Sequence, residues 1–127
     1  MASSPHQDDR TILDDDDLWR RIRPEWFVFD KNLSAKRLST AAFEDSSDGP
    51  MSVILVKEAG DPTTGLPTGF GVASLTAGAV RAQRQGVCRD PKPDEPAHAL
   101  VFGWKPYSVQ KALRKSAVLV LRPTDVP

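Results

Sequence analysis

His98 is the residue of this sequence with the clearest capacity for acid–base chemistry. An imidazole exchanges protons near neutral pH, and His98 stands between two alanines at the start of the apolar stretch 97–102. A carboxylate neighbour, Asp94 or Glu95, could tune it. Because catalysis needs several groups and the sequence shows no definite partner, a strand histidine bonded to the backbone is the favoured alternative.

Three arginines, Arg20, Arg21 and Arg23, stand beside two tryptophans, Trp19 and Trp26. Guanidinium groups suit phosphate or carboxylate, and aromatic rings can stack on a base. In a strand, Arg21 and Arg23 share one face and Arg20 takes the other. These five residues form a candidate binding surface; the alternative is a solvated strand face with arginine stems lying along apolar neighbours.

Arg37, Ser39 and Thr40 combine a base with two hydroxyl groups. Exposed on a loop or strand edge, they could bind an anion or hold a ribose. The alternative is that the two hydroxyls simply form a turn or a helix cap.

Lys111, Arg114 and Lys115 form a basic cluster in a predicted helix that begins at Val109. Such a helix can contact phosphates, in which case binding weakens steeply with salt. The alternative is the ordinary outer face of an amphipathic helix.

The order of these motifs resembles that of small ADP-ribosyltransferase-like toxins. An early Trp-Arg-Arg-Ile strand is followed by Arg-Leu-Ser-Thr and later by a histidine, and the resemblance spans residues 18–43. It implies that Arg21 and Ser39 lie near a dinucleotide. It also implies that His98, or an acid such as Glu58, serves as the third catalytic residue.

The elements that must position these residues are short, because eleven prolines and eight glycines interrupt the chain. Strands are predicted at 18–22, 26–29, 51–56, 70–75, 87–89 and 97–102, with a polar connector at 30–36. Helices are predicted over 77–85, capped by Thr76, and from Val109; the stretch 117–121 fits a helix tail or a final strand. This irregular order predicts an α+β domain with a mixed or antiparallel sheet of about five to seven strands and two helices.

The charge is balanced overall, with 17 Lys and Arg against 17 Asp and Glu, but it is unevenly distributed. Residues 1–17 hold six acids and one base, whereas residues 18–127 hold 16 bases and 11 acids. Low hydrophobicity and a run of four Asp predict that residues 1–17 are a disordered acidic tail on a single domain, 18–127. Deleting this tail is expected to leave the fold intact and to raise affinity for an anionic partner.

Several classes of protein are excluded by what the sequence lacks. No apolar run approaches the roughly 20 residues of a membrane span. One cysteine, Cys88, excludes an intramolecular disulfide and indicates a reducing, cytoplasmic location. One cysteine and two histidines cannot form the usual zinc site, and nucleotide-binding signatures are missing, so neither a metal nor a cofactor is expected.

The sequence therefore predicts a small cytoplasmic interaction or accessory protein that acts through a partner-binding surface, most simply for a protein. The first alternative is a small toxin-like enzyme, resembling ADP-ribosyltransferases or acting on RNA, that uses Arg21, Ser39 and His98. The second alternative is binding of nucleic-acid phosphates through the helix that carries Lys111, Arg114 and Lys115.

Overall fold

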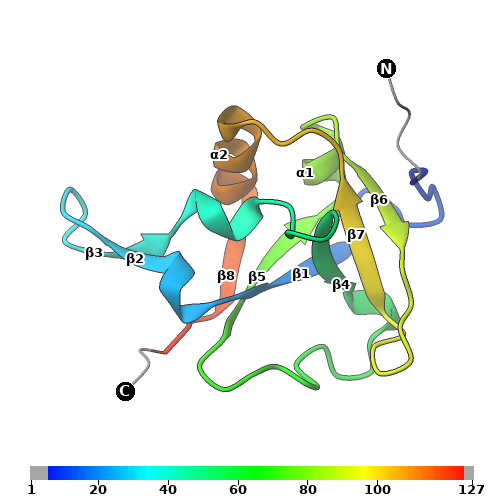
Figure 1. Ribbon diagram of the computed structural model, residues 1–127, viewed down its shortest axis with the longest axis horizontal. Coiled ribbons are helices and arrows are strands. Elements are labelled where there is room, and N and C mark those ends of the chain that lie inside the picture. The colour runs from blue at the N-terminus through cyan, green and yellow to red at the C-terminus, as the bar shows by residue number, and fades with distance from the viewer. Residues whose placement is uncertain (1–5, 125–127) are drawn as a thin grey trace.

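Eight strands and two α-helices make up the part of the chain that the computed structural model describes, residues 6–124. Six strands form the main sheet and two form a hairpin that projects from it (Figure 1). All paired strands are antiparallel. In spatial order the main sheet contains β6 (Gly86–Arg89), β7 (His98–Phe102), β4 (Met51–Leu55), β1 (Asp17–Ile22), β5 (Gly71–Thr76) and β8 (Val118–Leu121). The hairpin joins β2 (Phe27–Asp30) to β3 (Ala35–Leu38).

The predicted α+β class is confirmed, and the sheet is antiparallel throughout. The structure has one strand more than the upper end of the predicted range. That strand is β3, whose sequence Ala-Lys-Arg-Leu lacks the β-branched and aromatic residues that mark a strand, and whose first half lies within the predicted polar connector 30–36. The stretch that fitted either a helix tail or a strand is β8.

The core lies on one face of the main sheet. Leu18 and Ile22 of β1 point into it, and Leu113 of α2 (Tyr107–Ser116) packs there from above the sheet. Because side chains alternate along a strand, Trp19 and Arg21 take the outer face. This alternation decides which of the candidate residues can meet.

The two helices differ slightly from their predicted bounds. α1 (Ala77–Arg81) begins as predicted, with the hydroxyl of Thr76 accepting a hydrogen bond from the N–H of Ala79 at 3.1 Å. It ends early, and Arg84 has a φ of 60°, which helical backbone does not adopt. Neither helix, within residues 6–124, has the length and apolar character needed to cross a membrane.

Candidate functional site

A pocket of about 240 Å³ on the outer face of the central strands contains two of the predicted catalytic residues, Arg21 and His98. Trp19 of β1 is paired with Ile54 of β4, and Ile54 is paired with His98 of β7. These three side chains therefore form a row across the sheet, because directly opposite residues lie about 5 Å apart. Arg21 follows Trp19 by two residues and lies on the same face.

His98 is oriented by Asp90, not by either of the acids that the sequence suggested. Its Nδ1 lies 3.1 Å from the backbone carbonyl oxygen of Asp90 and 3.0 Å from its carboxylate. In a neutral imidazole this makes Nδ1–H the donor and leaves Nε2 as an acceptor. The side chain is only 7% exposed. A general base needs this kind of fixed orientation.

Arg21 is held by two loops beside the pocket. Its Nη2 donates to the carbonyl oxygen of Thr64 at 3.1 Å and lies 2.9 Å from Oε1 of Glu95. The contact with Glu95 is an ion pair without hydrogen-bond geometry, so Oε1 remains unsatisfied. The Nε of Arg21 is also buried without a hydrogen-bond partner among the described residues. Because Glu95 balances the guanidinium charge, an anion could bind Arg21 only by displacing this carboxylate.

Ser39 lies outside this pocket, so the structure does not bring the three predicted catalytic residues together. It is the N-cap of a short 3₁₀ helix, Thr40–Phe43, and its hydroxyl accepts a hydrogen bond from the N–H of Ala41 at 3.1 Å. Phe43 of this turn is buried in the core. Ser39 therefore belongs to a turn packed on the core side of the sheet, whereas Arg21 is on the outer side. The alternative reading of Ser39 as a cap is the one that the geometry supports.

Four residues of the predicted tryptophan–arginine surface, Arg20, Arg21, Arg23 and Trp26, line a second pocket of about 570 Å³, whereas Trp19 lines only the pocket that contains His98. Two guanidinium groups lie over the ring of Trp26, with the central carbons of Arg20 and Arg23 at 5.1 and 5.5 Å from the ring centroid, within cation–π range. Arg20 is only 8% exposed, and it donates to the backbone carbonyls of Ala42 and Ser52 at 2.8 and 2.9 Å. Burial lowers the pKa of Arg20 to about 10. Arg20 is thus a buried link between elements and not a surface ligand.

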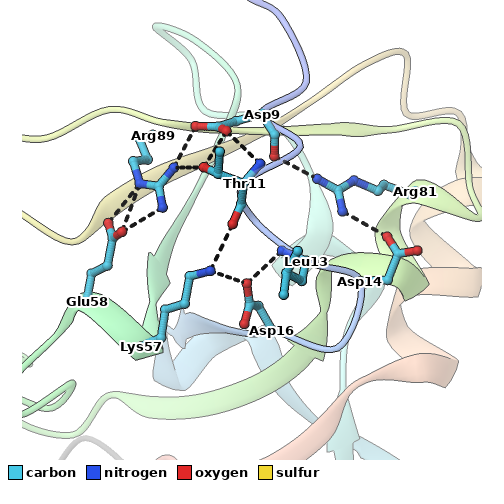
Figure 2. A network of polar contacts seen from close by, with 9 residues as sticks. All are labelled: Asp9, Thr11, Leu13, Asp14, Asp16, Lys57, Glu58, Arg81 and Arg89. Carbon is cyan, nitrogen blue, oxygen red and sulfur yellow. Dashed lines mark hydrogen bonds and ion pairs between the residues drawn. The ribbon is translucent and has the colours of Figure 1, made fainter.

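The acidic segment at the N-terminus is ordered against the domain over residues 6–16, and β1 begins at Asp17 (Figure 2). Ile12 is fully buried in the hydrophobic core. The predicted disorder is therefore wrong for residues 6–17, and residues 1–5 lie outside the described residues. The prediction relied on the mean composition of the segment, which gives little weight to the single side chain of Ile12 that anchors it.

Ion pairs fix the segment on either side of Ile12. Figure 2 shows cations from three separate elements pointing toward its carboxylates. The pairs are Asp8–Arg81 (3.1 Å), Asp14–Arg81 (2.8 Å), Asp9–Arg89 (2.7 Å) and Asp16–Lys57 (2.5 Å). Four of the six carboxylates of the segment therefore pair with three cations of the domain.

The contacts lower the pKa values of the carboxyl groups. A hydrogen bond from the Thr11 hydroxyl, together with one from Arg89, holds the pKa of Asp9 below its usual value. A hydrogen bond from Lys57 does the same for the pKa of Asp16. These acids therefore bind their cations most firmly when ionised.

The same segment closes one edge of the main sheet. β6 is the last strand on that side. The N–H of Asp9 donates to the carbonyl oxygen of Val87 at 2.7 Å, and the carboxylate of Asp8 accepts from the N–H of Val87 at 2.9 Å. Backbone groups of an edge strand that would otherwise be open to another chain are thus already satisfied.

The opposite edge, β8, is apolar and exposed. Val118, Leu119, Val120 and Leu121 are 65%, 37%, 48% and 44% exposed. In the described sheet β8 pairs with β5 on one side and forms the end of the strand order on the other. Four consecutive exposed apolar side chains on an open edge are the features of a strand that can accept another strand.

A groove of about 420 Å³ lies between β8, the end of α2 and the hairpin. Phe27 and Leu119 supply apolar walls, and Arg37, Arg114 and Arg122 supply guanidinium groups. The hairpin, α2, β8 and the residue that follows β8 carry one acid, Asp30, and seven bases: Lys31, Lys36, Arg37, Lys111, Arg114, Lys115 and Arg122. We call β2–β3, α2, β8 and Arg122 the basic end.

The basic end unites predicted binding residues that are far apart in the sequence. Arg37 lies in the groove but is paired with Asp30 at 2.7 Å, and Arg114 faces the same groove from α2. Lys111 and Lys115 are exposed on α2. The residues that sequence reasoning missed here are those of β8, whose apolar run was indistinguishable from a buried strand.

Sequence reasoning also missed the partners of the acidic segment and of His98. The opposite charges of residues 1–17 and 18–127 indicated that the segment could fold back. They could not identify Arg81 or Arg89, because the contacts join residues 73 and 80 positions apart. Such pairing is decided by the sheet topology.

No protein-family model, no curated protein and no solved structure matches the chain. In residues 6–124 no group of three or more His, Cys, Asp or Glu side chains is arranged to hold a metal ion.

Proposed function

We propose that the protein is an interaction module that binds an extended polypeptide segment by adding it to the main sheet at β8. The observation that carries this proposal is the exposure of four consecutive apolar residues on the open edge, at 37–65% each. An unpaired edge offers a row of backbone N–H and C=O groups to a second chain. This develops the prediction of a small protein that acts through a partner-binding surface.

The neighbouring groove supports this proposal. It lies along β8 and includes Leu119 in its wall, so a strand added to β8 would occupy it. Pairing would supply backbone hydrogen bonds, while burial of Val and Leu side chains would supply hydrophobic free energy. Single exposed apolar residues elsewhere on the surface offer neither.

A neutral peptide, Ac-Gln-Gln-Thr-Val-Thr-Val-Thr-Gln-Gln-NH₂, tests the proposal by fluorescence anisotropy. Saturable binding is expected, with backbone amide shifts in NMR concentrated on β8 and the groove. The variant Val118→Asn/Val120→Asn, which keeps the net charge, should weaken binding about 10-fold or more, because each position loses both strand propensity and apolar contact.

The matched control is Leu13→Asn/Trp104→Asn, which removes two exposed apolar side chains, 55% and 84% exposed, away from β8. Its affinity for the peptide should equal that of the unmodified protein. Equal losses in the two variants, or no saturable binding, would contradict strand addition.

A second candidate function is acid–base chemistry on a small molecule in the pocket of Arg21 and His98. The orientation of His98 by Asp90 favours it. The resemblance to ADP-ribosyltransferases suggests nicotinamide adenine dinucleotide as the probe. Binding should shift the NMR signals of His98, and the shifts should be lost in Arg21→Gln. Unperturbed His98 signals at millimolar dinucleotide would remove this candidate.

A further inference from the structure

We infer that the segment which binds β8 is acidic, with carboxylates on both sides of its paired residues. This inference rests on the proposed strand addition and specifies the partner's chemistry. Besides Lys36 and the Asp30–Arg37 pair, the basic end carries five bases, Lys31, Lys111, Arg114, Lys115 and Arg122, and no further acid. A partner of opposite charge is therefore favoured over a neutral or basic one.

The positions of two arginines make the inference specific. Arg122 follows β8 immediately, and Arg114 stands four residues before it, at the end of α2. Both line the groove that contains Leu119. A strand lying along β8 would therefore pass one guanidinium near each of its ends.

These cations are available for a partner. Lys111, Arg114 and Lys115 have no acidic partner among the described residues, and α2 contains no Asp or Glu. The described contact of Arg122 is with the ring of Phe27, at 5.2 Å from its centroid, which leaves its charge unbalanced. The cations near the acidic segment differ in this respect, since that segment neutralises them.

The apolar edge distinguishes a polypeptide from the other anionic macromolecules. A nucleic-acid backbone offers no groups for strand pairing and gains little from Val118 and Val120. A second copy of this chain is also disfavoured, because antiparallel pairing of two β8 strands would place the same cations, Arg114 and Arg122, against each other. An acidic strand would pair with the backbone groups of β8 and would also balance the charges of Arg114 and Arg122.

Three peptides with the same Thr-Val-Thr-Val-Thr centre test the inference, flanked on each side by two Glu, two Gln or two Lys. At low salt the Glu peptide should bind about 10-fold more tightly than the Gln peptide, since a few exposed ion pairs contribute modestly. The Lys peptide should bind most weakly. The advantage of the Glu peptide should shrink at about 0.5 M salt, where exposed charges are screened.

The variant Arg114→Gln/Arg122→Gln should remove most of the preference for the Glu peptide while leaving binding of the Gln peptide within about 2-fold. A control with the same loss of charge is Arg10→Gln/Lys92→Gln, which lies outside the basic end and should keep the preference.

The outcomes separate this inference from the proposal beneath it. Equal binding of all three peptides, abolished by Val118→Asn/Val120→Asn, would overturn the acidic partner and retain strand addition. Failure of every peptide would overturn both. Tight binding of a single-stranded DNA 15-mer, insensitive to Val118→Asn/Val120→Asn, would show that the basic end serves phosphates and would overturn the acidic strand.

Discussion

The two edge strands of the main sheet, β6 and β8, are four residues each and end the sheet on opposite sides, yet the chain treats them differently. β6 is covered by the protein's own N-terminal segment, which uses hydrogen bonds to Val87 and ion pairs to Arg81 and Arg89. β8 presents its side chains to solvent beside Arg114 and Arg122, which have no acidic partner among the described residues.

This difference supports the proposed binding of a partner strand at β8. An uncovered edge is a hazard that proteins usually protect with charges, proline or a covering segment. Here the acidic segment covers β6 and leaves β8 open, although its charge is opposite to that of the basic end beside β8. The contrast between the two edges is therefore a reason to test β8 as the binding edge.

The largest effect should come from the anchor of the covered edge. Ile12→Ala should lower the free energy of unfolding by about 2–5 kcal/mol, because Ile12 is fully buried. Urea denaturation measures it. Leu13→Ala, at a residue 55% exposed, should stay within about 0.5 kcal/mol. Similarly small effects of the two substitutions would contradict this prediction and would support the disorder predicted from composition.

A smaller loss is expected for the cation at the centre of the ion pairs. Arg81→Gln should cost about 1–3 kcal/mol, since its side chain is 12% exposed and contacts both Asp8 and Asp14. Arg10 also contacts Asp8 but is 77% exposed, so Arg10→Gln should change stability by about 0.5 kcal/mol or less. If the two substitutions cost the same, the covered edge is not held by Arg81.

Acid should weaken the covered edge. The pKa values of Asp9 and Asp16 are lowered in the folded protein, so their contribution is fully present above the unfolded value of about 3.8 and is lost as pH falls through the folded values. Urea midpoints measured from pH 7 to pH 3 should fall less steeply in Asp9→Asn/Asp16→Asn. Asp15→Asn, whose carboxylate has no ion-pair partner among the described residues, should keep the original slope.

The smallest effect on stability belongs to the open edge. Val118→Asn/Val120→Asn should lower the free energy of unfolding by about 1 kcal/mol or less, because both side chains already face solvent. The same variant should lose peptide binding, which separates function from folding. A destabilisation as large as that of Ile12→Ala would show that the side chains of β8 are needed for folding, and it would contradict the contrast between the two edges.

Local patterns predicted the fold better than they predicted the site. The alternation of β1 placed Ile22 in the core and separated Arg20 from Arg21 correctly, since a strand has a period of two. It also placed Arg21 on the same face of the sheet as His98. The two residues line one pocket across β4, which lies between their strands. Ser39 failed to join them because its turn packs on the other side of the sheet.

Partners could not be predicted from nearness in sequence. Asp94 and Glu95 are closer to His98 along the chain, but the antiparallel register of β6 and β7 brings Asp90 beside it, with the N–H of Asp90 donating to the carbonyl oxygen of His98 at 2.9 Å. Likewise the burial of Ile12 depends on a hydrophobic core assembled from distant strands. Both contacts depend on how distant strands are arranged in the fold, so neither could be predicted from local sequence.

The way the N-terminal segment covers β6 has a consequence for the order of folding. The segment is synthesised before the strand that it covers, and its contacts with Val87 and Arg89 require residues made about 80 positions later. We therefore expect the segment to dock on β6 only after that strand has been made and paired with β7. A chain truncated before residue 86 would therefore contain the N-terminal segment but lack β6, the strand that the segment covers.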